Sequence, residues 1–162
     1  MESAGHARSA LAAGEGLSPL GALLAAIARA KIRFQVIGMT AAILQGAPGA
    51  TIDTDLWIDL PERQYMRVIN LAHQLGASLL SATVVAMTDG VLVNFCFSIH
   101  GVASFETEYR RAKWIAWEGQ RVKVLPLARI IRSKEAAGRE KDLAVLPLLR
   151  STLAADRIRR RR

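Results

Sequence analysis

The chain has 162 residues, of which 51% are hydrophobic, so it is long enough to bury one core and fits a single globular domain. Its formal net charge of +8 comes mostly from five arginines within residues 157–162, and the rest of the chain is only mildly basic. A single cysteine, Cys96, excludes an internal disulfide, and the apolar stretch at residues 19–28 is too short to span a bilayer, so we expect a cytoplasmic protein without a membrane partner.

The N-terminal half of the sequence predicts helices and strands in alternation. Residues 1–17 are rich in alanine, glycine and serine without periodicity, so we expect a flexible lead-in there. Ser18 is a suitable N-cap for a helix that runs to about Ala30. The elements expected next are a strand at residues 34–37 that stops at Gly38, a helix at 39–44, a strand at 52–60 and a helix from Pro61 to about Leu75.

The next part of the sequence predicts two β-hairpins. Residues 83–87 and 91–99 are β-prone runs, and the Asp89–Gly90 pair between them supplies the positive φ that a tight turn needs. A second hairpin is expected at residues 114–117 and 121–125, where Glu118 and Gly119 form the turn.

The C-terminal part predicts two helices and a basic tail. A helix is expected from Pro126 to about Ala137, where Gly138 interrupts it, and helical spacing resumes at residues 141–155. We therefore expect one α/β (α+β) domain at residues 18–155 and a tail at residues 156–162. The arginines of this tail are either a phosphate-binding segment or a plain solubilising end.

Asp53 and Asp55 are the residues most suggestive of chemistry. They are two positions apart in a predicted strand, so they point to the same face, with carboxylates about 7 Å apart. Carboxylates on a rigid strand, with space for water and phosphate oxygens, are what Mg²⁺ selects, and two such ions can hold the attacking and departing oxygens of a phosphoryl displacement. The pattern alone fits two solvated strand residues as well as it fits a metal-binding pair, so the neighbouring sequence must decide between these two interpretations.

The surroundings of the acidic pair favour a polyphosphate ligand. The strand before it ends at Gly38, where a missing side chain lets a backbone amide approach a ligand. A helix begins there, and helix N-termini favour anions. A nucleoside triphosphate (NTP) is therefore expected to bind at Gly38, Met39 and Thr40, bridged by metal to the aspartates.

This order of elements resembles the DNA polymerase beta-type nucleotidyltransferase superfamily, and it is most similar to small bacterial proteins related to abortive-infection toxin nucleotidyltransferases. The resemblance spans roughly residues 32–149. It implies a mixed β-sheet with helices packed on it and a C-terminal helical segment. The residues that carry it are Gly38, Ala41, Gly46, Pro48, Thr51, Asp53, Asp55 and Leu56.

The resemblance also implies an activity, which is metal-dependent transfer of a nucleotidyl group from an NTP to a hydroxyl of RNA, protein or a small molecule. Asp53 and Asp55 would hold Mg²⁺ or Mn²⁺. Residues 133–144 look like the basic helical segment of the same proteins, so Lys134, Arg139 and Lys141 are candidates to approach the phosphates. The alternative is a solvated basic face whose charges pair with the nearby acidic residues Glu135, Glu140 and Asp142.

Three positions depart from the pattern of these proteins. Met39 stands where a glycine or serine would contact phosphate, which leaves Thr40 as the neighbouring hydroxyl. Gly49 stands where many relatives have an arginine. Asn94, in the strand at residues 91–97, takes the place of a third carboxylate, and an amide neither accepts a proton as a general base nor binds Mg²⁺ as strongly.

The sequence leaves three hypotheses open: an active nucleotidyltransferase, a catalytically impaired module that binds nucleotide or RNA or a toxin-like partner, and a self-associating structural domain without a ligand. The histidines, the cysteine and the tryptophans do not indicate a further site. The histidines are isolated, so a zinc site is not expected, and Cys96 is expected to be buried filler. Trp57, Trp114 and Trp117 are expected to pack in the core instead of stacking on bases.

Overall fold

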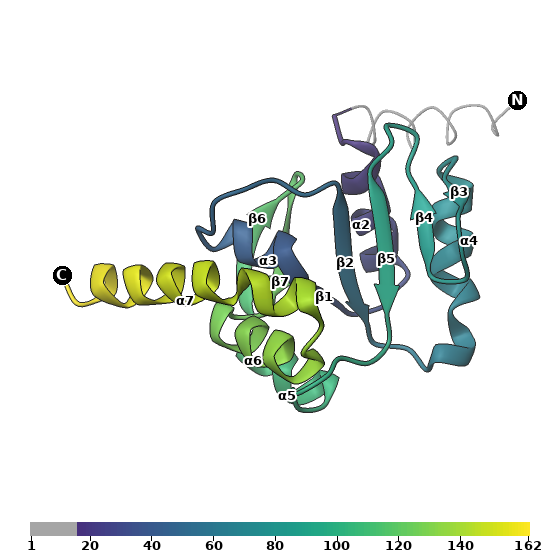
Figure 1. Cartoon of the computed structure of the whole chain (residues 1–162). Helices are drawn as coiled ribbons and strands as arrows, with labels where there is room; N and C mark the ends of the chain where they lie inside the picture. The colour runs from purple at the N-terminus through teal and green to yellow at the C-terminus, as the bar shows by residue number, and fades with distance from the viewer. Residues whose placement is uncertain (1–15) are drawn as a thin grey trace, which may run out of the picture.

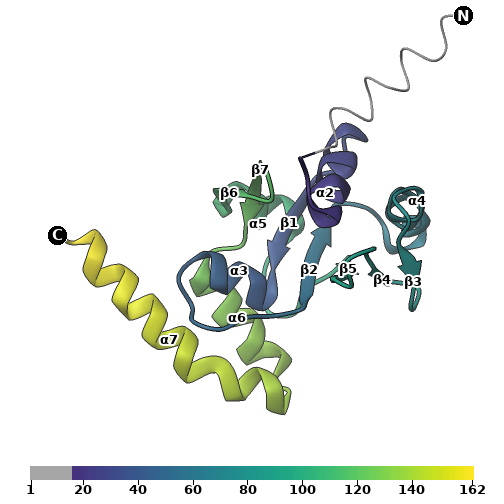
Figure 2. The same ribbon diagram turned by 90° about the horizontal axis from the view of Figure 1, so that it is seen from above.

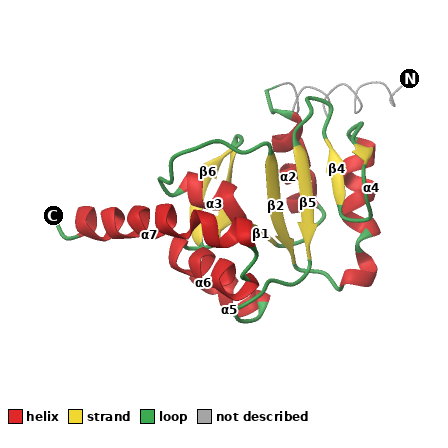
Figure 3. Ribbon diagram, viewed as in Figure 1, coloured by secondary structure: helices red, strands yellow, loops and turns green. Residues whose placement is uncertain are grey.

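The computed structural model describes residues 16–162, which form a single mixed sheet with helices on both faces (Figure 1). Most of the lead-in predicted at residues 1–17 lies outside this range. The secondary-structure colouring separates the seven strands from the surrounding helices (Figure 3). The helices are α2 (Pro19–Arg29), α3 (Gly38–Leu44), the 3-10 helix η1 (Glu62–Gln64), α4 (Met66–Gln74), α5 (Phe105–Arg111), α6 (Leu127–Ala137) and α7 (Glu140–Arg160).

The sheet runs in the order β3-β4-β5-β2-β1-β7-β6 and mixes parallel with antiparallel pairs. The central strand β2 is antiparallel to β1 and parallel to β5, and β1 is parallel to β7. Both outer pairs of strands are antiparallel. The strands are β1 (Phe34–Ile37), β2 (Asp53–Ile58), β3 (Ser78–Leu79), β4 (Val84–Ala86), β5 (Leu92–Cys96), β6 (Lys113–Trp117) and β7 (Gln120–Val124).

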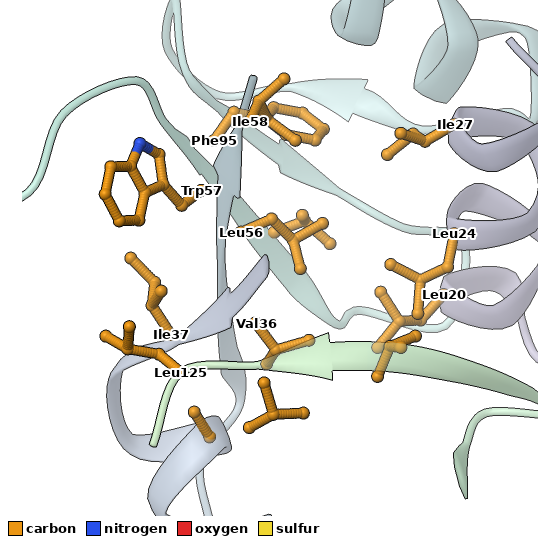
Figure 4. Close-up of a cluster of buried hydrophobic side chains, with 14 of the residues drawn as sticks. Leu20, Leu24, Ile27, Val36, Ile37, Leu56, Trp57, Ile58, Phe95 and Leu125 are labelled. Atoms are coloured by element: carbon orange, nitrogen blue, oxygen red, sulfur yellow. The ribbon is translucent and has the colours of Figure 1, made fainter. Parts of the chain in front are cut away.

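Helix α2 builds the core on one face of the sheet. Ser18 caps it by accepting a hydrogen bond from the Gly21 amide at 3.0 Å, and Pro19 follows at the first helical position, as the sequence predicts. Seen from above, α2 and α4 lie on one side of the sheet, with α3, α6 and α7 on the other (Figure 2). Apolar side chains spaced three or four residues apart on α2 face side chains from β1 and β2 (Figure 4): Leu20, Leu24, Ile27, Val36, Leu56 and Ile58.

Helix α5 joins the opposite face through one aromatic contact and one buried ion pair. The Phe105 ring meets Trp57 edge to face at 5.3 Å between centroids. Glu108, which is fully buried, accepts hydrogen bonds from the Arg129 guanidinium of α6 at 2.6 and 3.0 Å. Because a buried charge is costly unless it is paired, this ion pair fixes α5 against α6.

Most predicted elements are confirmed, and the differences have local causes. Both hairpins form, and Glu118 and Gly119 adopt positive φ in the second turn. The helix expected from Pro61 is divided into η1 and α4. The last helix continues to Arg160 instead of ending near Ala155, so the arginines expected in a tail extend a helix that projects away from the sheet (Figure 2). Helix α5 and strand β3 are not predicted by the sequence pattern.

Candidate functional site

The acidic pair lies at the N-terminal end of the central strand β2. Asp53 is exposed and Asp55 is half-buried, whereas Thr54 between them is buried, as expected for alternating strand residues. Both carboxylates line one cavity of about 240 Å³. The structure therefore confirms that the two acids are held side by side at an opening.

Asn94 is the neighbour of Asp55 on the adjacent strand. The parallel pairing of β2 with β5 places Asp53 opposite Leu92 and Asp55 opposite Asn94. Asn94 lines the same cavity as both aspartates. The position expected for a third carboxylate therefore faces the acidic pair and carries an amide.

Gly38 lies against the other side of Asp55. The antiparallel pairing of β1 with β2 places Ile37 opposite Asp55, and Gly38 follows with a φ of 66°. A Cβ at this position would lie 2.6 Å from Asp55 Oδ2, which is closer than side chains tolerate. Only glycine therefore leaves the carboxylate in its present position.

Met39 and Thr40 are placed differently from the prediction. Thr40 is buried, and its hydroxyl donates a hydrogen bond to the Asp53 carbonyl at 3.0 Å. Neither residue lines the two cavities that adjoin the acidic pair. Thr40 thus ties α3 to the strand that carries the aspartates, and the contact of Met39 and Thr40 with phosphate stays a prediction.

A second cavity of about 240 Å³ lies between the sheet and helices α6 and α7. Gly38, Asp55 and Asn94 form its sheet side, and Lys134 and Arg139 bring positive charge from the helical side. Arg139 lines both cavities, so the two openings share one wall. An anion in the cavity beside Lys134 and Arg139 would therefore lie next to a cation bound by Asp53 and Asp55.

Asp142 holds the basic residues of this wall in place. Its side chain is 2% exposed and accepts hydrogen bonds from Arg139 Nε at 2.6 Å and from Lys134 Nζ at 3.4 Å. Although burial alone would raise the pKa of Asp142, the hydrogen bonds and charges of Arg139 and Lys134 outweigh it and lower the pKa. The sequence indicates Asp142 only as a charge partner, because the burial of its side chain depends on packing between α6 and α7.

The other predicted pairings of the basic segment are only partly present. Glu135 pairs with Arg150 at 3.3 Å and not with Lys134. Lys141 is exposed, lines the cavity at Asp53 and Asp55, and forms no ion pair with any residue in the range 16–162. Lys141 is therefore the cation of this segment whose charge is most available to a ligand.

Burial raises the pKa of the Asp55 carboxyl above its usual range, and the Asp53 charge raises it further. The hydrogen bond of Asn94 and the charges of Lys134 and Lys141 oppose this rise without cancelling it. Burial and the nearby Asp55 charge also raise the pKa of the Cys96 thiol to about 12. Cys96 is therefore a protonated, unreactive thiol, but it is half-buried and lines the cavity beside α6 instead of being fully buried filler.

Several residues at the site carry no recognisable sequence signal. Ser98 and His100 line the cavity between the sheet and α6, although an isolated histidine gave no reason to place it there. Among the described residues no cluster of three or more His, Cys, Asp or Glu side chains is present, so the acidic site consists of two carboxylates and one amide. Trp114, expected in the core, is 51% exposed.

Comparisons with known proteins identify the fold. No family profile and no curated protein sequence matches the chain. The solved antibiotic-resistance factor ANT(2'')-Ia superposes with a TM-score of 0.58 at 14% identity, covering 87% of this chain and 85% of that one. The lincosamide antibiotic adenylyltransferase LnuA superposes with a TM-score of 0.56 at 11% identity, covering 83% of this chain and 96% of that one.

A candidate nucleotidyltransferase from Thermotoga maritima superposes with a TM-score of 0.53 at 17% identity, covering 77% of this chain and 86% of that one. Identities this low show the fold alone. The chain therefore has a nucleotidyltransferase fold, as the sequence predicts. None of the helices in the described part of the chain combines the length and apolar character needed to cross a bilayer.

Proposed function

We propose that this protein transfers a nucleotidyl group from an NTP to a hydroxyl acceptor, with Asp53 and Asp55 as its metal-binding residues. The observation that carries the proposal is the shared opening of the two carboxylates, which adjoins a cavity walled by Gly38, Lys134 and Arg139. The nucleotidyltransferase fold supports it, since two of the superposed proteins are named as adenylyltransferase or shown with an adenylylated antibiotic.

The residues present fit a divalent cation. Asp53 and Asp55 supply hard oxygen ligands, and Gly38 leaves free the space that a Cβ would take from Asp55. When bound, Mg²⁺ or Mn²⁺ would supply charge stabilisation to the phosphate oxygens. Lys141 and Arg139, on the opposite wall, would add positive charge toward the same phosphates.

The proposed reaction balances without any further reactant. The acceptor oxygen forms a bond to the α-phosphorus while the bond from that phosphorus to the bridging oxygen breaks, and pyrophosphate leaves. Because the Asn94 amide cannot accept a proton, the proton of the acceptor hydroxyl passes to one of the two carboxylates or to solvent. Lys134 and Arg139, which Asp142 holds in place, orient the negatively charged pyrophosphate as it leaves.

The acceptor is proposed only as a class, a hydroxyl compound that is RNA, protein or a small molecule. A second structure of ANT(2'')-Ia is a complex with adenylyl-2''-tobramycin and the LnuA structure is lincomycin-bound, and this supports a small molecule as the acceptor. We place the protein in the cytoplasm, where NTPs are available, in keeping with its single cysteine.

Asn94 favours a second candidate function, in which the protein binds nucleotide or RNA, or serves as a toxin-antitoxin-type interaction module, without efficient transfer. Asn94 occupies the position in register with Asp55, and an uncharged amide weakens both metal binding and proton transfer there. The cavities and their cations would still hold a nucleotide.

An Asn94→Asp variant separates the two functions. We expect this variant to transfer α-labelled nucleotide from an NTP to bulk RNA, protein or small-molecule hydroxyls faster than the wild type, because the third carboxylate restores metal charge and a general base. The assay measures acceptor labelling in the presence of Mg²⁺ or Mn²⁺, and Asp89→Asn, in an exposed turn, is the control. If NTP raises the unfolding temperature of the wild type and of Asn94→Asp but neither protein transfers label, the binding module is favoured.

A further inference from the structure

A third cavity, distinct from the acidic site, lies at the start of β1. Its volume is about 320 Å³. It is enclosed by the end of α2, the turn into β1, α5 and the β6–β7 hairpin. The side chains that form its rim are Lys31, Arg33, Tyr109, Trp114, Arg121 and Lys123.

The charged side chains that line this cavity are all positive. Four of its lining residues are cationic and none is acidic. Arg33 is engaged by Asp59 at 2.8 Å and by Glu106. Within residues 16–162, Lys31, Arg121 and Lys123 form no ion pair, so no carboxylate neutralises these three positive charges, although Lys123 Nζ donates to the Tyr109 and Ala112 carbonyls.

Trp114 gives the cavity an exposed aromatic face. It is 51% exposed on β6, the edge strand of the sheet. The Arg121 guanidinium lies over the ring, 5.5 Å from its centroid, and Lys123 Nζ also lies over it, 4.9 Å from the centroid, so both cations make cation–π contacts with the indole. Lys123 is also fixed by a hydrogen bond to the Tyr109 carbonyl at 3.1 Å. An indole ring and its flanking cations are therefore held together at the surface.

We propose that this cavity binds a nucleotide unit of a single-stranded nucleic acid, with its base stacked on Trp114 and its phosphates held by Arg121, Lys123 and Lys31. Exposed aromatic rings stack on bases, and neighbouring cations follow the phosphate backbone, which is how proteins hold single strands without reading sequence. The volume of about 320 Å³ accommodates one nucleotide. An uncharged aromatic ligand would leave the three positive charges without a counter-ion.

This site is separate from the acidic pair. Phe34 lines the third cavity and Gly38 lines the cavity beside Asp55, so β1 lies between them. At about 3.3 Å per strand residue, the two positions are about 13 Å apart along the chain. The proposal therefore does not depend on the transfer activity.

Binding of a fluorescein-labelled oligouridine of about ten nucleotides tests the proposal. We expect Trp114→Ala and Arg121→Glu each to weaken binding about tenfold or more, and Trp114→Phe to retain most of it. The slope of log affinity against log salt should fall by about 0.7 for each cation removed. Because Trp114 and Arg121 are exposed, circular dichroism should show unchanged folding.

Matched controls establish whether the oligouridine binds at this cavity. Arg63→Glu makes the same charge change on η1, outside the cavity, and should alter binding less than twofold. Asp53→Asn combined with Asp55→Asn should bind the oligouridine like the wild type. Equal losses in Arg121→Glu and Arg63→Glu, loss of binding in the aspartate variant, or uridine monophosphate binding as tightly as the oligomer would each overturn the proposal.

Discussion

Replacing Gly38 by alanine is expected to lower NTP affinity roughly ten- to hundredfold. The added Cβ would lie 2.6 Å from Asp55 Oδ2 and must displace the carboxylate or the turn. A displaced carboxylate loses its charged contact with the ligand, which costs about 1.5–3 kcal/mol of binding, or roughly ten- to hundredfold in affinity. The backbone φ of 66° adds a cost of about 1 kcal/mol in the free energy of unfolding, because side chains disfavour this conformation. Denaturant unfolding and NTP titration measure the two effects.

Gly138→Ala is the matched control for Gly38→Ala. Gly138 has a φ of 62°, nearly the same conformation, but its added Cβ would meet only the Glu135 carbonyl oxygen at 3.7 Å, an ordinary contact. It should therefore show the loss of about 1 kcal/mol in stability and no further loss of NTP affinity. If both variants bind NTP equally, the contact between Gly38 and Asp55 has no role in the site.

Replacing Asp142 by asparagine is expected to lower the free energy of unfolding by about 2 kcal/mol at neutral pH, since charged hydrogen bonds to Arg139 and Lys134 are lost. The loss should depend on pH. Because the folded pKa of Asp142 is lowered, its stabilisation is fully present above the unfolded aspartate pKa of about 3.9 and is lost as pH falls through the folded pKa.

The measurement is the difference in unfolding free energy between wild type and Asp142→Asn from neutral pH to below about 3.9. The difference should be largest at neutral pH and should shrink under acidic conditions. Glu140→Gln, at an exposed neighbouring position without an ion pair in the described chain, is the control for loss of a surface carboxylate. A difference that stays constant with pH would show that the pairing of Asp142 does not stabilise the fold.

Much of the fold could be predicted because its boundaries are local. Ser18, Gly90, Gly119 and Gly138 end or begin elements by capping or turn chemistry that depends on neighbouring residues only. Helix α5 was missed because it is short, and its anchor, Glu108, pairs with Arg129 from a distant helix. Such a long-range partner leaves no periodic signal in the sequence.

The candidate site was predictable where spacing along one strand decides geometry, as for Asp53 and Asp55. The neighbour relation of Asp55 and Asn94 needed the register of β2 with β5. Hydrogen bonding of Thr40 to Asp53 and the exposure of Trp114 depend on packing and on the edge position of β6, which sequence patterns do not specify. The expectation of core packing was wrong for Trp114, whereas for Thr40 the structure adds a hydrogen bond that the sequence did not predict.

The most direct test of the central claim is the unfolding temperature of the protein with a mixture of the four NTPs and Mg²⁺, compared with an Asp53→Asn, Asp55→Asn double variant. A ligand at about a hundred times its Kd adds about 2.7 kcal/mol to stability. We predict that NTP with Mg²⁺ raises the unfolding temperature of the wild type, that chelation of the metal removes the increase, and that the double variant shows none. Equal stabilisation of both proteins, or of neither, would contradict the assignment of the acidic pair as an NTP and metal site.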